Sequence, residues 1–180
     1  MSSANYNLDL TNVPNAESKS FGIVVSEWNN EITNNLLIGS LDLFKSKNVP
    51  RKNIHIIRVP GSFELIYGCK KMQDKNVDAI IAIGSLIRGE TSHFDYICQS
   101  TSQGIKDLNV QGESPVIFCV LTDDTFQQAL DRSGGKFGNK GVEAAIAAIK
   151  MAFIWNIFLE PRAFQNILRL LFQGACDVPY

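Results

Sequence analysis

Short apolar runs alternate with amphipathic segments along most of the chain. Four mainly apolar runs are typical of strands buried on both faces. They lie at residues 21–25, 54–59, 79–83 and 115–121. Apolar residues at helical spacing predict helices between and after these runs. The helices cover about residues 32–44, 63–75, 91–108, 125–132 and 142–158. We expect a loop at residues 84–90 and a glycine-rich turn at residues 133–141.

Strands that alternate with helices indicate βαβ units and a parallel sheet covered on both faces. The predicted fold class is α/β, a flavodoxin-like three-layer α/β/α sandwich around a four-stranded parallel sheet. In such folds ligands bind beyond the carboxyl ends of the strands. The candidate ligand-binding loops therefore lie at residues 26–30, 60–64, 84–93 and 121–125.

The remaining parts of the chain flank this single domain, which we place at residues 21–158. Residues 1–20 are polar and rich in Asn and Ser, and we expect them to form a disordered arm. Residues 159–180 form a C-terminal extension, in which apolar residues after Pro161 predict a short helix.

Composition narrows the classes of protein further. The 180 residues include 45% hydrophobic and 19% charged residues, which is typical of one globular domain. The net charge of -1 argues against a nucleic-acid partner, because such proteins usually carry a basic excess. No apolar stretch is long enough to predict a membrane span, and the N-terminal residues do not resemble a signal peptide.

Four cysteines are present, and their spacing indicates neither a metal site nor a disulfide scaffold. The sequence contains no Cys-x-x-Cys pair and no histidine close to Cys69, Cys98, Cys119 or Cys176. We therefore expect no bound metal. We also expect the protein to work in a reducing compartment, the cytoplasm. Cys119 lies in the middle of a predicted strand, where a thiol is expected to be buried and inert.

The two histidines differ in their predicted positions. His93 follows a strand-end loop at the start of a helix, where a side chain with a reference pKa of about 6.5 can exchange protons with a ligand. Position alone supports a catalytic role and an exposed helix-start histidine equally. His55 lies inside a predicted strand and is interpreted as a packed or edge-facing residue.

The same loop offers a binding site for an anion. Gly89 permits a tight turn, and the amides of Glu90 and Thr91 are expected at a helix N-terminus, where free N–H groups favour phosphate. Simple capping of the helix is the alternative. Arg132 and Lys140 are candidate phosphate partners, although solvated cations are the favoured interpretation from position alone.

Trp28 and Glu64 are further candidates for ligand contacts. Trp28 lies in a polar strand-end loop, where either a stacked heteroaromatic ligand or packing back onto the first helix explains it. Glu64 can accept hydrogen bonds from ligand hydroxyls, or can be a first-turn acid favoured by the helix dipole.

Taken together, these loops resemble the 6,7-dimethyl-8-ribityllumazine synthase family of riboflavin biosynthesis. The matching motifs occur in the family's order and spacing and cover about residues 21–158. They are Ser-Glu-Trp-Asn at 26–29, Val-Pro-Gly-Ser-Phe-Glu at 59–64, Gly-Ser-Leu-Ile-Arg-Gly-Glu-Thr-Ser-His-Phe at 84–94, Pro-Val-Ile-Phe at 115–118, Val-Leu-Thr at 120–122, and Arg132 with Gly-Asn-Lys-Gly at 138–141.

The resemblance implies a transferase that condenses 5-amino-6-(D-ribitylamino)uracil with 3,4-dihydroxy-2-butanone 4-phosphate to 6,7-dimethyl-8-ribityllumazine, releasing phosphate and water. Trp28 is implied to stack on the pyrimidine, and His93 to be the acid/base catalyst. Further contacts to the ring and the ribityl chain are implied for Ser62, Phe63, Glu64, Ser85, Leu86 and Ile87. Glu90, Thr91 and Arg132 are implied to bind the phosphate, with Lys140 near it or near the forming ring. The chemistry requires no cofactor.

Phe118 is implied to come from a neighbouring subunit, so that the site lies at an interface. The resemblance thus implies a homo-oligomer, a pentamer at least. The stretch from Arg132 to Lys140 without extra residues favours an icosahedral shell of pentamers, whereas the two terminal segments argue against one.

The sequence departs from the family pattern at two positions, with Ile66 in place of a proline and Cys119 in place of a glycine. Two alternatives remain beside the enzyme. A flavin-binding module of the flavodoxin type needs a glycine-rich loop after the first strand, which residues 26–31 do not provide. A non-catalytic shell or scaffold protein is the other, and the presence of His93, Arg132 and Glu64 weighs against it.

Overall fold

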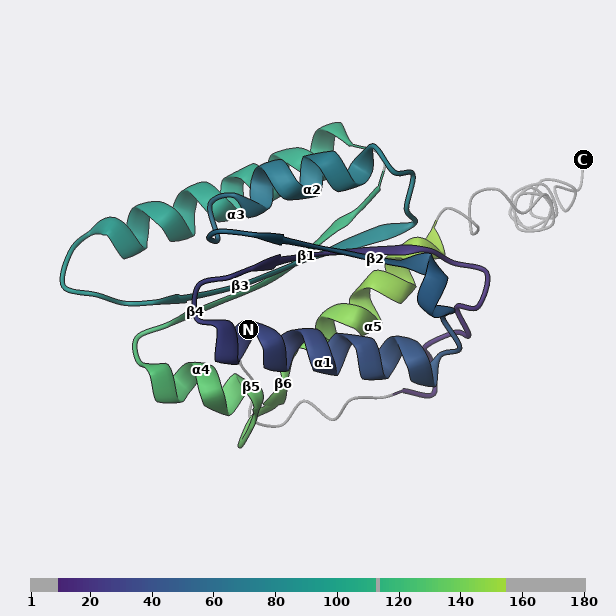
Figure 1. The fold of residues 1–180 in the computed structure, drawn as a ribbon, viewed down its shortest axis with the longest axis horizontal. Helices are drawn as coiled ribbons and strands as arrows, with labels where there is room; N and C mark the ends of the chain where they lie inside the picture. Colours follow the sequence, from purple (N-terminus) through teal and green to yellow (C-terminus); the bar gives the residue numbers. More distant parts are fainter. Residues whose placement is uncertain (1–9, 113, 155–180) are drawn as a thin grey trace, which may run out of the picture.

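The computed structural model describes residues 10–112 and 114–154 of the chain. Its centre is a parallel sheet in the order β2-β1-β3-β4, which Figure 1 shows nearly edge-on. The strands are β1 (Phe21–Ser26), β2 (Ile54–Val59), β3 (Ala79–Ile87) and β4 (Val116–Asp123). All six residues of β1 are buried, as the continuous apolar run predicts for a central strand.

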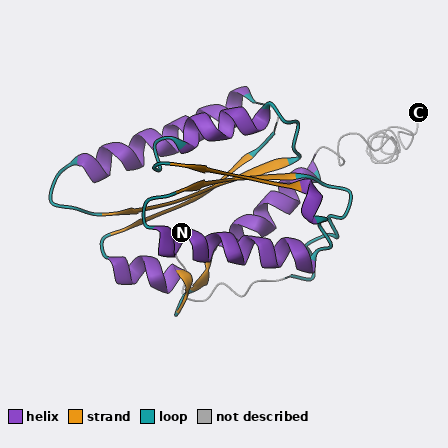
Figure 2. Cartoon of the chain, viewed as in Figure 1, coloured by secondary structure: helices purple, strands orange, loops and turns teal. Residues whose placement is uncertain are grey.

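Helices cover both faces of this sheet, which confirms the predicted three-layer α/β fold (Figure 2). One layer contains α1 (Asn30–Ser46), α4 (Phe126–Arg132) and α5 (Lys140–Ala152). The other contains α2 (Leu65–Gln73) and α3 (His93–Gln111). A short 3-10 helix, η1 (Arg51–Asn53), precedes β2, and a small hairpin, β5 (Ser133–Gly135) and β6 (Gly138–Asn139), precedes α5.

Each layer of helices packs on its own apolar core. In the core under α1 and α5, the rings of Phe21 and Phe44 stack with centroids 4.4 Å apart. The smaller core under α2 and α3 includes Leu65, Met72 and Ile105. Because both faces of the sheet are buried, the strands are held in a fixed register, and this register fixes the loops at their carboxyl ends.

The third strand is longer than the sequence pattern indicates. We expected a loop at residues 84–90, but β3 continues to Ile87 because its ladder with β4 extends from Gly84–Val120 to Ile87–Asp123. Likewise, the expected turn at residues 133–141 contains the β5–β6 hairpin, with Gly134 and Gly138 at positive φ. The predicted end of the last helix at residue 158 lies outside the described residues.

The segment before β1 differs from the expected disordered arm where the structure describes it. Val13 and Ala16 are buried in the core under α1. The Ala16 N–H donates to the Lys47 carbonyl over 2.9 Å, and Lys47 Nζ donates to the Val13 carbonyl over 2.9 Å. Two buried apolar side chains and these hydrogen bonds attach the polar segment. Two apolar residues are too few for periodicity to detect. Residues 1–9 and 159–180 lie outside the described residues.

No helix in the described part of the chain has the length and apolar character needed to cross a membrane.

Candidate active site

A pocket of about 500 Å³ opens at the carboxyl ends of β1, β2 and β3. Its lining includes His93 and every residue that the family resemblance assigns to the ring and the ribityl chain except Phe118. The lining residues are Trp28, Asn29, Gly61, Ser62, Phe63, Glu64, Ser85, Leu86, Ile87, His93 and Ile97. The pocket lies where open α/β sheets bind their ligands.

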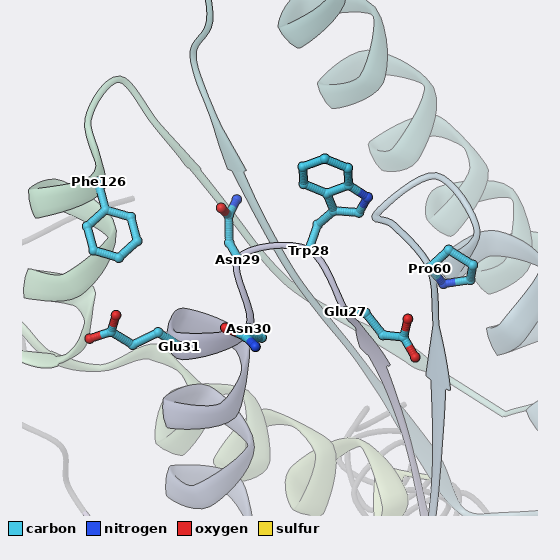
Figure 3. Close-up of a pocket in the computed structure, with 7 residues that line it drawn as sticks. All are labelled: Glu27, Trp28, Asn29, Asn30, Glu31, Pro60 and Phe126. Carbon is cyan, nitrogen blue, oxygen red and sulfur yellow. The ribbon is translucent and has the colours of Figure 1, made fainter.

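Trp28 forms one wall of this pocket from the loop between β1 and α1. Its side chain is 72% exposed, and Figure 3 shows the indole standing away from α1. Of the two interpretations of this residue, packing back onto the first helix is therefore wrong. The loop itself is fixed, because the Glu27 N–H donates to the Val59 carbonyl and the Trp28 N–H donates to the Pro60 carbonyl.

Asn29 also lines the pocket, and the sequence analysis missed it. Its backbone is left-handed, with φ of 54°, immediately before α1. Asn is enriched at such positions, so an Asn before a predicted helix is the signal that was available. Its side-chain Nδ2 donates to the Ser85 carbonyl over 2.9 Å and joins the first loop to β3.

Gly61 is required by the close approach of its neighbours. A Cβ at this position would lie 2.9 Å from Glu64 Oε2 and 3.6 Å from Trp28 Cδ1. Without that Cβ, the Glu64 carboxylate lies over the loop between β2 and α2, beside the indole. An exposed acceptor and an exposed aromatic ring are thereby brought to one wall of the pocket.

Two residues of the pocket lining carry buried hydroxyls without hydrogen-bond partners. Ser62 Oγ and Ser85 Oγ are both buried, and neither meets a donor or acceptor among the described residues. Ser62 packs so closely on β3 that a Cβ at Gly84 would lie 2.8 Å from its Oγ. Because buried polar groups are nearly always hydrogen-bonded, these two hydroxyls leave hydrogen-bonding capacity unused in residues that line the pocket.

His93 is the first residue of α3, and its exposed side chain lines the pocket beside Ile97, one turn further along the helix. The position of Glu90 and Thr91 differs from the prediction. Both are exposed and precede the Ser92 cap, rather than forming the first turn of the helix. Thr91 Oγ1 accepts from the His93 N–H at 3.4 Å, so it caps the residue that bears the imidazole.

Arg88 holds the loop that leads to His93, and the sequence analysis gave it no role. Its guanidinium contacts both Asp95 carboxylate oxygens at 3.0 and 3.2 Å, and donates from Nε to Asp124 at 2.9 Å. It also lies over the Phe94 ring, 4.3 Å from the centroid. Hydrogen bonds to Asp95 and then to Asp124 raise the pKa of this already cationic group. The loop is thus tied to α3 and to the turn after β4.

Five of the predicted site residues lie outside the pocket lining. Glu90 and Thr91 belong to the loop before α3, and the other three come from β4, α4 and α5. Phe118 is 43% exposed on β4, a strand at the edge of the sheet. The Arg132 guanidinium, at the end of α4, donates to Asp123 over 2.7 Å. The Lys140 ammonium, at the start of α5, lies 2.6 Å from the Glu143 carboxylate. In the described protomer these side chains do not line the pocket that carries His93.

Cys119 occupies the position expected for it, buried in the middle of β4. Its Sγ donates to the Lys140 carbonyl at 3.7 Å, and burial raises the pKa of the thiol to about 12. It therefore packs against the start of α5 as a neutral thiol.

A second hollow, of about 450 Å³, shares Trp28 and Asn29 with the pocket and is drawn in Figure 3. Its other lining residues are Glu27, Asn30, Glu31, Pro60 and Phe126. Apart from Trp28, it contains none of the predicted site residues. Among the residues that the structure describes, no three His, Cys, Asp or Glu side chains gather closely enough to hold a metal ion.

The fold and the pocket define an α/β-sandwich protein built to bind a polar small molecule beside a histidine. The chain belongs to the 6,7-dimethyl-8-ribityllumazine synthase family, because the sequence model of that family matches residues 18–156. It is 60% identical over 146 residues to the 6,7-dimethyl-8-ribityllumazine synthase of Christiangramia forsetii, which covers 80% of this chain and 87% of that one.

Two further relatives carry the same name. The protein of Flavobacterium johnsoniae is 59% identical over 158 residues, which are 86% of this chain and 83% of that one. The protein of Porphyromonas gingivalis is 49% identical over 161 residues, covering 87% of this chain and all of that one.

Proposed function

We propose that this protein is a transferase that forms 6,7-dimethyl-8-ribityllumazine from 5-amino-6-(D-ribitylamino)uracil and 3,4-dihydroxy-2-butanone 4-phosphate. One observation carries the proposal in this member of the family: a single pocket gathers His93 with an exposed indole, an exposed carboxylate and two unpartnered hydroxyls. These groups complement a flat heteroaromatic ring that bears a polyhydroxylated chain.

In the proposed complex, the pyrimidine ring stacks on Trp28 and the ribityl chain lies along the wall formed by residues 62–64. Glu64 and the Ser62 hydroxyl then form hydrogen bonds with the ribityl hydroxyls. Residues 85–87, at the end of β3, contact the ring edge. The unpartnered hydroxyls of Ser62 and Ser85 support this placement, since a hydroxylated ligand supplies the partners that the protomer does not.

The proposed reaction needs positioning and proton transfer. The pyrimidine amine attacks the ketone carbonyl of the butanone, and loss of one water gives an imine. Elimination then releases phosphate, and the ribityl-bearing amine closes the ring with loss of a second water. His93 carries protons between the attacking amine and the leaving groups, which its exposed position at the start of α3 supports.

The phosphate of the butanone is proposed to bind near Glu90 and Thr91, together with Arg132 and with Lys140 close by. Because Phe118, Arg132 and Lys140 do not line the pocket of their own protomer, we assign them to the pocket of an adjacent copy. The exposed Phe118 ring on an edge strand supports such a contact. The enzyme is then a homo-oligomer, a pentamer that can assemble further into an icosahedral shell.

Mixing two impaired variants tests this shared site. His93→Ala and Arg132→Ala damage different halves, so hybrid oligomers contain some interfaces with both intact halves and should regain part of the activity. If mixed subunits stay as impaired as the parent variants after exchange, the two residues act within one protomer. A monomer in sedimentation at micromolar concentration contradicts the shared site directly.

The proposed compartment is the cytoplasm. The cysteines that the structure describes, Cys69, Cys98 and Cys119, are all free thiols, which supports a reducing environment.

The function is tested by mixing the purified protein with both substrates and following the absorbance and fluorescence of the lumazine. We expect saturable formation of product well above the uncatalysed condensation. The flavin-binding alternative predicts a yellow protein that forms no product, and the scaffold alternative predicts a colourless oligomer without activity. Family membership does not favour either alternative.

A further inference from the structure

Arg132 is held by a buried aspartate at the end of β4. Its Nη1 donates to Asp123 Oδ1 over 2.7 Å. The Asp123 side chain is only 4% exposed and that of Arg132 is 23% exposed, so water reaches the pair poorly. Salt screens such a pair less than it screens an ion pair at the surface. The contact therefore sets the orientation of the guanidinium.

This ion pair leaves groups on both partners unused. Asp123 Oδ2 and Arg132 Nε are buried, and neither meets a hydrogen-bond partner within the described residues. A carboxylate and a guanidinium that satisfy one another often meet through two parallel hydrogen bonds. Here a single hydrogen bond holds one corner of the guanidinium. Because Nε is buried, only Nη1 and Nη2 can offer their remaining N–H groups to a second anion.

The backbone that carries Asp123 is fixed against the pocket wall. Asp123 is paired with Ile87 in the ladder between β3 and β4, and its carbonyl accepts from the Arg88 N–H at 3.0 Å. Ile87 lines the pocket of this protomer, whereas Arg132 is assigned to the pocket of the adjacent copy. The carboxylate is thus presented from a rigid element rather than from a loose loop.

We propose that Asp123 is a positioning residue for Arg132, an inference that rests on the proposed function. Asp123 binds Nη1 and thereby aims the remaining N–H groups of the guanidinium at the phosphate of the butanone substrate. It does not touch the substrate itself. In its absence the arginine side chain regains rotamer freedom, and this freedom must be lost again each time phosphate binds.

The charge of Asp123 acts in the opposite direction, because a carboxylate near the site repels phosphate. Orientation dominates, since the Asp123 charge is already compensated by the guanidinium that it contacts at 2.7 Å. The two effects predict opposite signs, so a measurement can separate them. Loss of orientation weakens phosphate binding, whereas loss of repulsion strengthens it.

Asp123→Ala should raise the KM for the butanone phosphate about tenfold, as expected when a charge-assisted contact loses its geometry. The KM for the pyrimidine should change less than about twofold. Asp123→Asn keeps an oxygen that accepts from Nη1, and its KM for the butanone phosphate should fall between those of the wild type and Asp123→Ala. Asp131→Asn is the matched control, because it also removes one negative charge. The Asp131 carboxylate lies on α4, where it accepts from Gln127 Nε2 at 2.9 Å.

A double-mutant cycle separates positioning from a general structural effect. If Asp123 acts only through Arg132, Asp123→Ala should change the KM for the butanone phosphate less than about twofold in an Arg132→Ala background. Persistence of the tenfold effect without the arginine overturns the proposal, as does an equal rise in both KM values or a lower KM for the phosphate substrate. If Asp123→Ala does not fold, Asp123→Asn decides by the same criteria.

Calorimetry with inorganic phosphate provides a readout that does not depend on turnover. We expect phosphate to bind more weakly to Asp123→Ala than to the wild type and to the Asp131→Asn control. If the wild type forms no lumazine but shows this difference, the proposed function fails and the positioning role stands. If the wild type is active and the variants bind phosphate equally, the positioning role fails alone.

Discussion

Replacing Trp28 with alanine should separate substrate affinity from protein stability. The indole is 72% exposed, so little more than a quarter of its surface is buried in the protomer. For a side chain of roughly 250 Å², this burial is about 70 Å². At about 25 cal/mol per Å², its loss lowers the free energy of unfolding by at most about 2 kcal/mol. The melting temperature should fall by only a few degrees.

Trp28→Ala should also weaken binding of the pyrimidine substrate. Stacking of a base on an aromatic side chain contributes about 1–3 kcal/mol. This range corresponds to a dissociation constant that rises about fivefold to about 150-fold. The butanone phosphate does not stack, so its KM should change less than about threefold, which is small beside the stacking range.

Calorimetric titration with the pyrimidine, together with thermal unfolding, measures both quantities. Trp28→Phe keeps an aromatic face and should stay within about threefold of the wild type, within the tolerance of stacking for different rings. Tyr67→Ala is the matched control, since Tyr67 is 69% exposed on α2 and lies outside the pocket lining. Unchanged pyrimidine affinity in a folded Trp28→Ala variant refutes the stacking role, and global unfolding refutes the burial argument.

Three further predictions concern catalysis, thiol reactivity and packing. His93→Ala should lower turnover about 10²- to 10⁴-fold, measured by steady-state kinetics after subtraction of the uncatalysed rate. The affinity for the pyrimidine should stay within about threefold of the wild type. Wild-type turnover in this variant would contradict the acid/base role. Burial raises the pKa of Cys69 and Cys119 to about 12. At pH 8 only about 10⁻⁴ of either thiol is therefore thiolate, which is the reactive form. Both should resist alkylation until the pH rises well above 9. Mass spectrometry should find Cys98, which is only partly buried, modified before these two, and the opposite order contradicts the assigned burial. Gly84→Ala places a Cβ within 2.8 to 3.2 Å of three side-chain atoms. It should lower the free energy of unfolding, measured with denaturant, by about 1–3 kcal/mol. An unchanged free energy of unfolding would show that the neighbouring side chains move aside without cost.

The strands and helices were predictable because each has a local pattern of apolar residues. β1 reads as a continuous apolar run since helices cover both of its faces. The end of β3 was missed because Gly84 and Ser85 are locally typical of a loop, whereas the ladder with β4 holds them in the sheet. The contact of Ala16 with Lys47 was missed for the same reason, since a single long-range hydrogen bond leaves no periodic trace.

The candidate site was predictable where family motifs coincide with the strand ends, as they do at Trp28, Glu64 and His93. Residues that act by contact between loops were not predictable. Arg88 joins Asp95 and Asp124 only once β3 and β4 are aligned. Asp123 likewise meets Arg132 through the turn of α4, and no spacing rule in the sequence distinguishes it from a solvated acid.

The most direct test of the central claim is a crystal structure of the oligomer with 5-amino-6-(D-ribitylamino)uracil bound. The account predicts the pyrimidine ring stacked on Trp28, with the ribityl hydroxyls bonded to Ser62 and Glu64 and the amine facing His93. It also predicts Phe118 of an adjacent copy against the ligand. A pyrimidine bound in the second hollow on the other side of Trp28, or a pocket closed by one protomer alone, would contradict it.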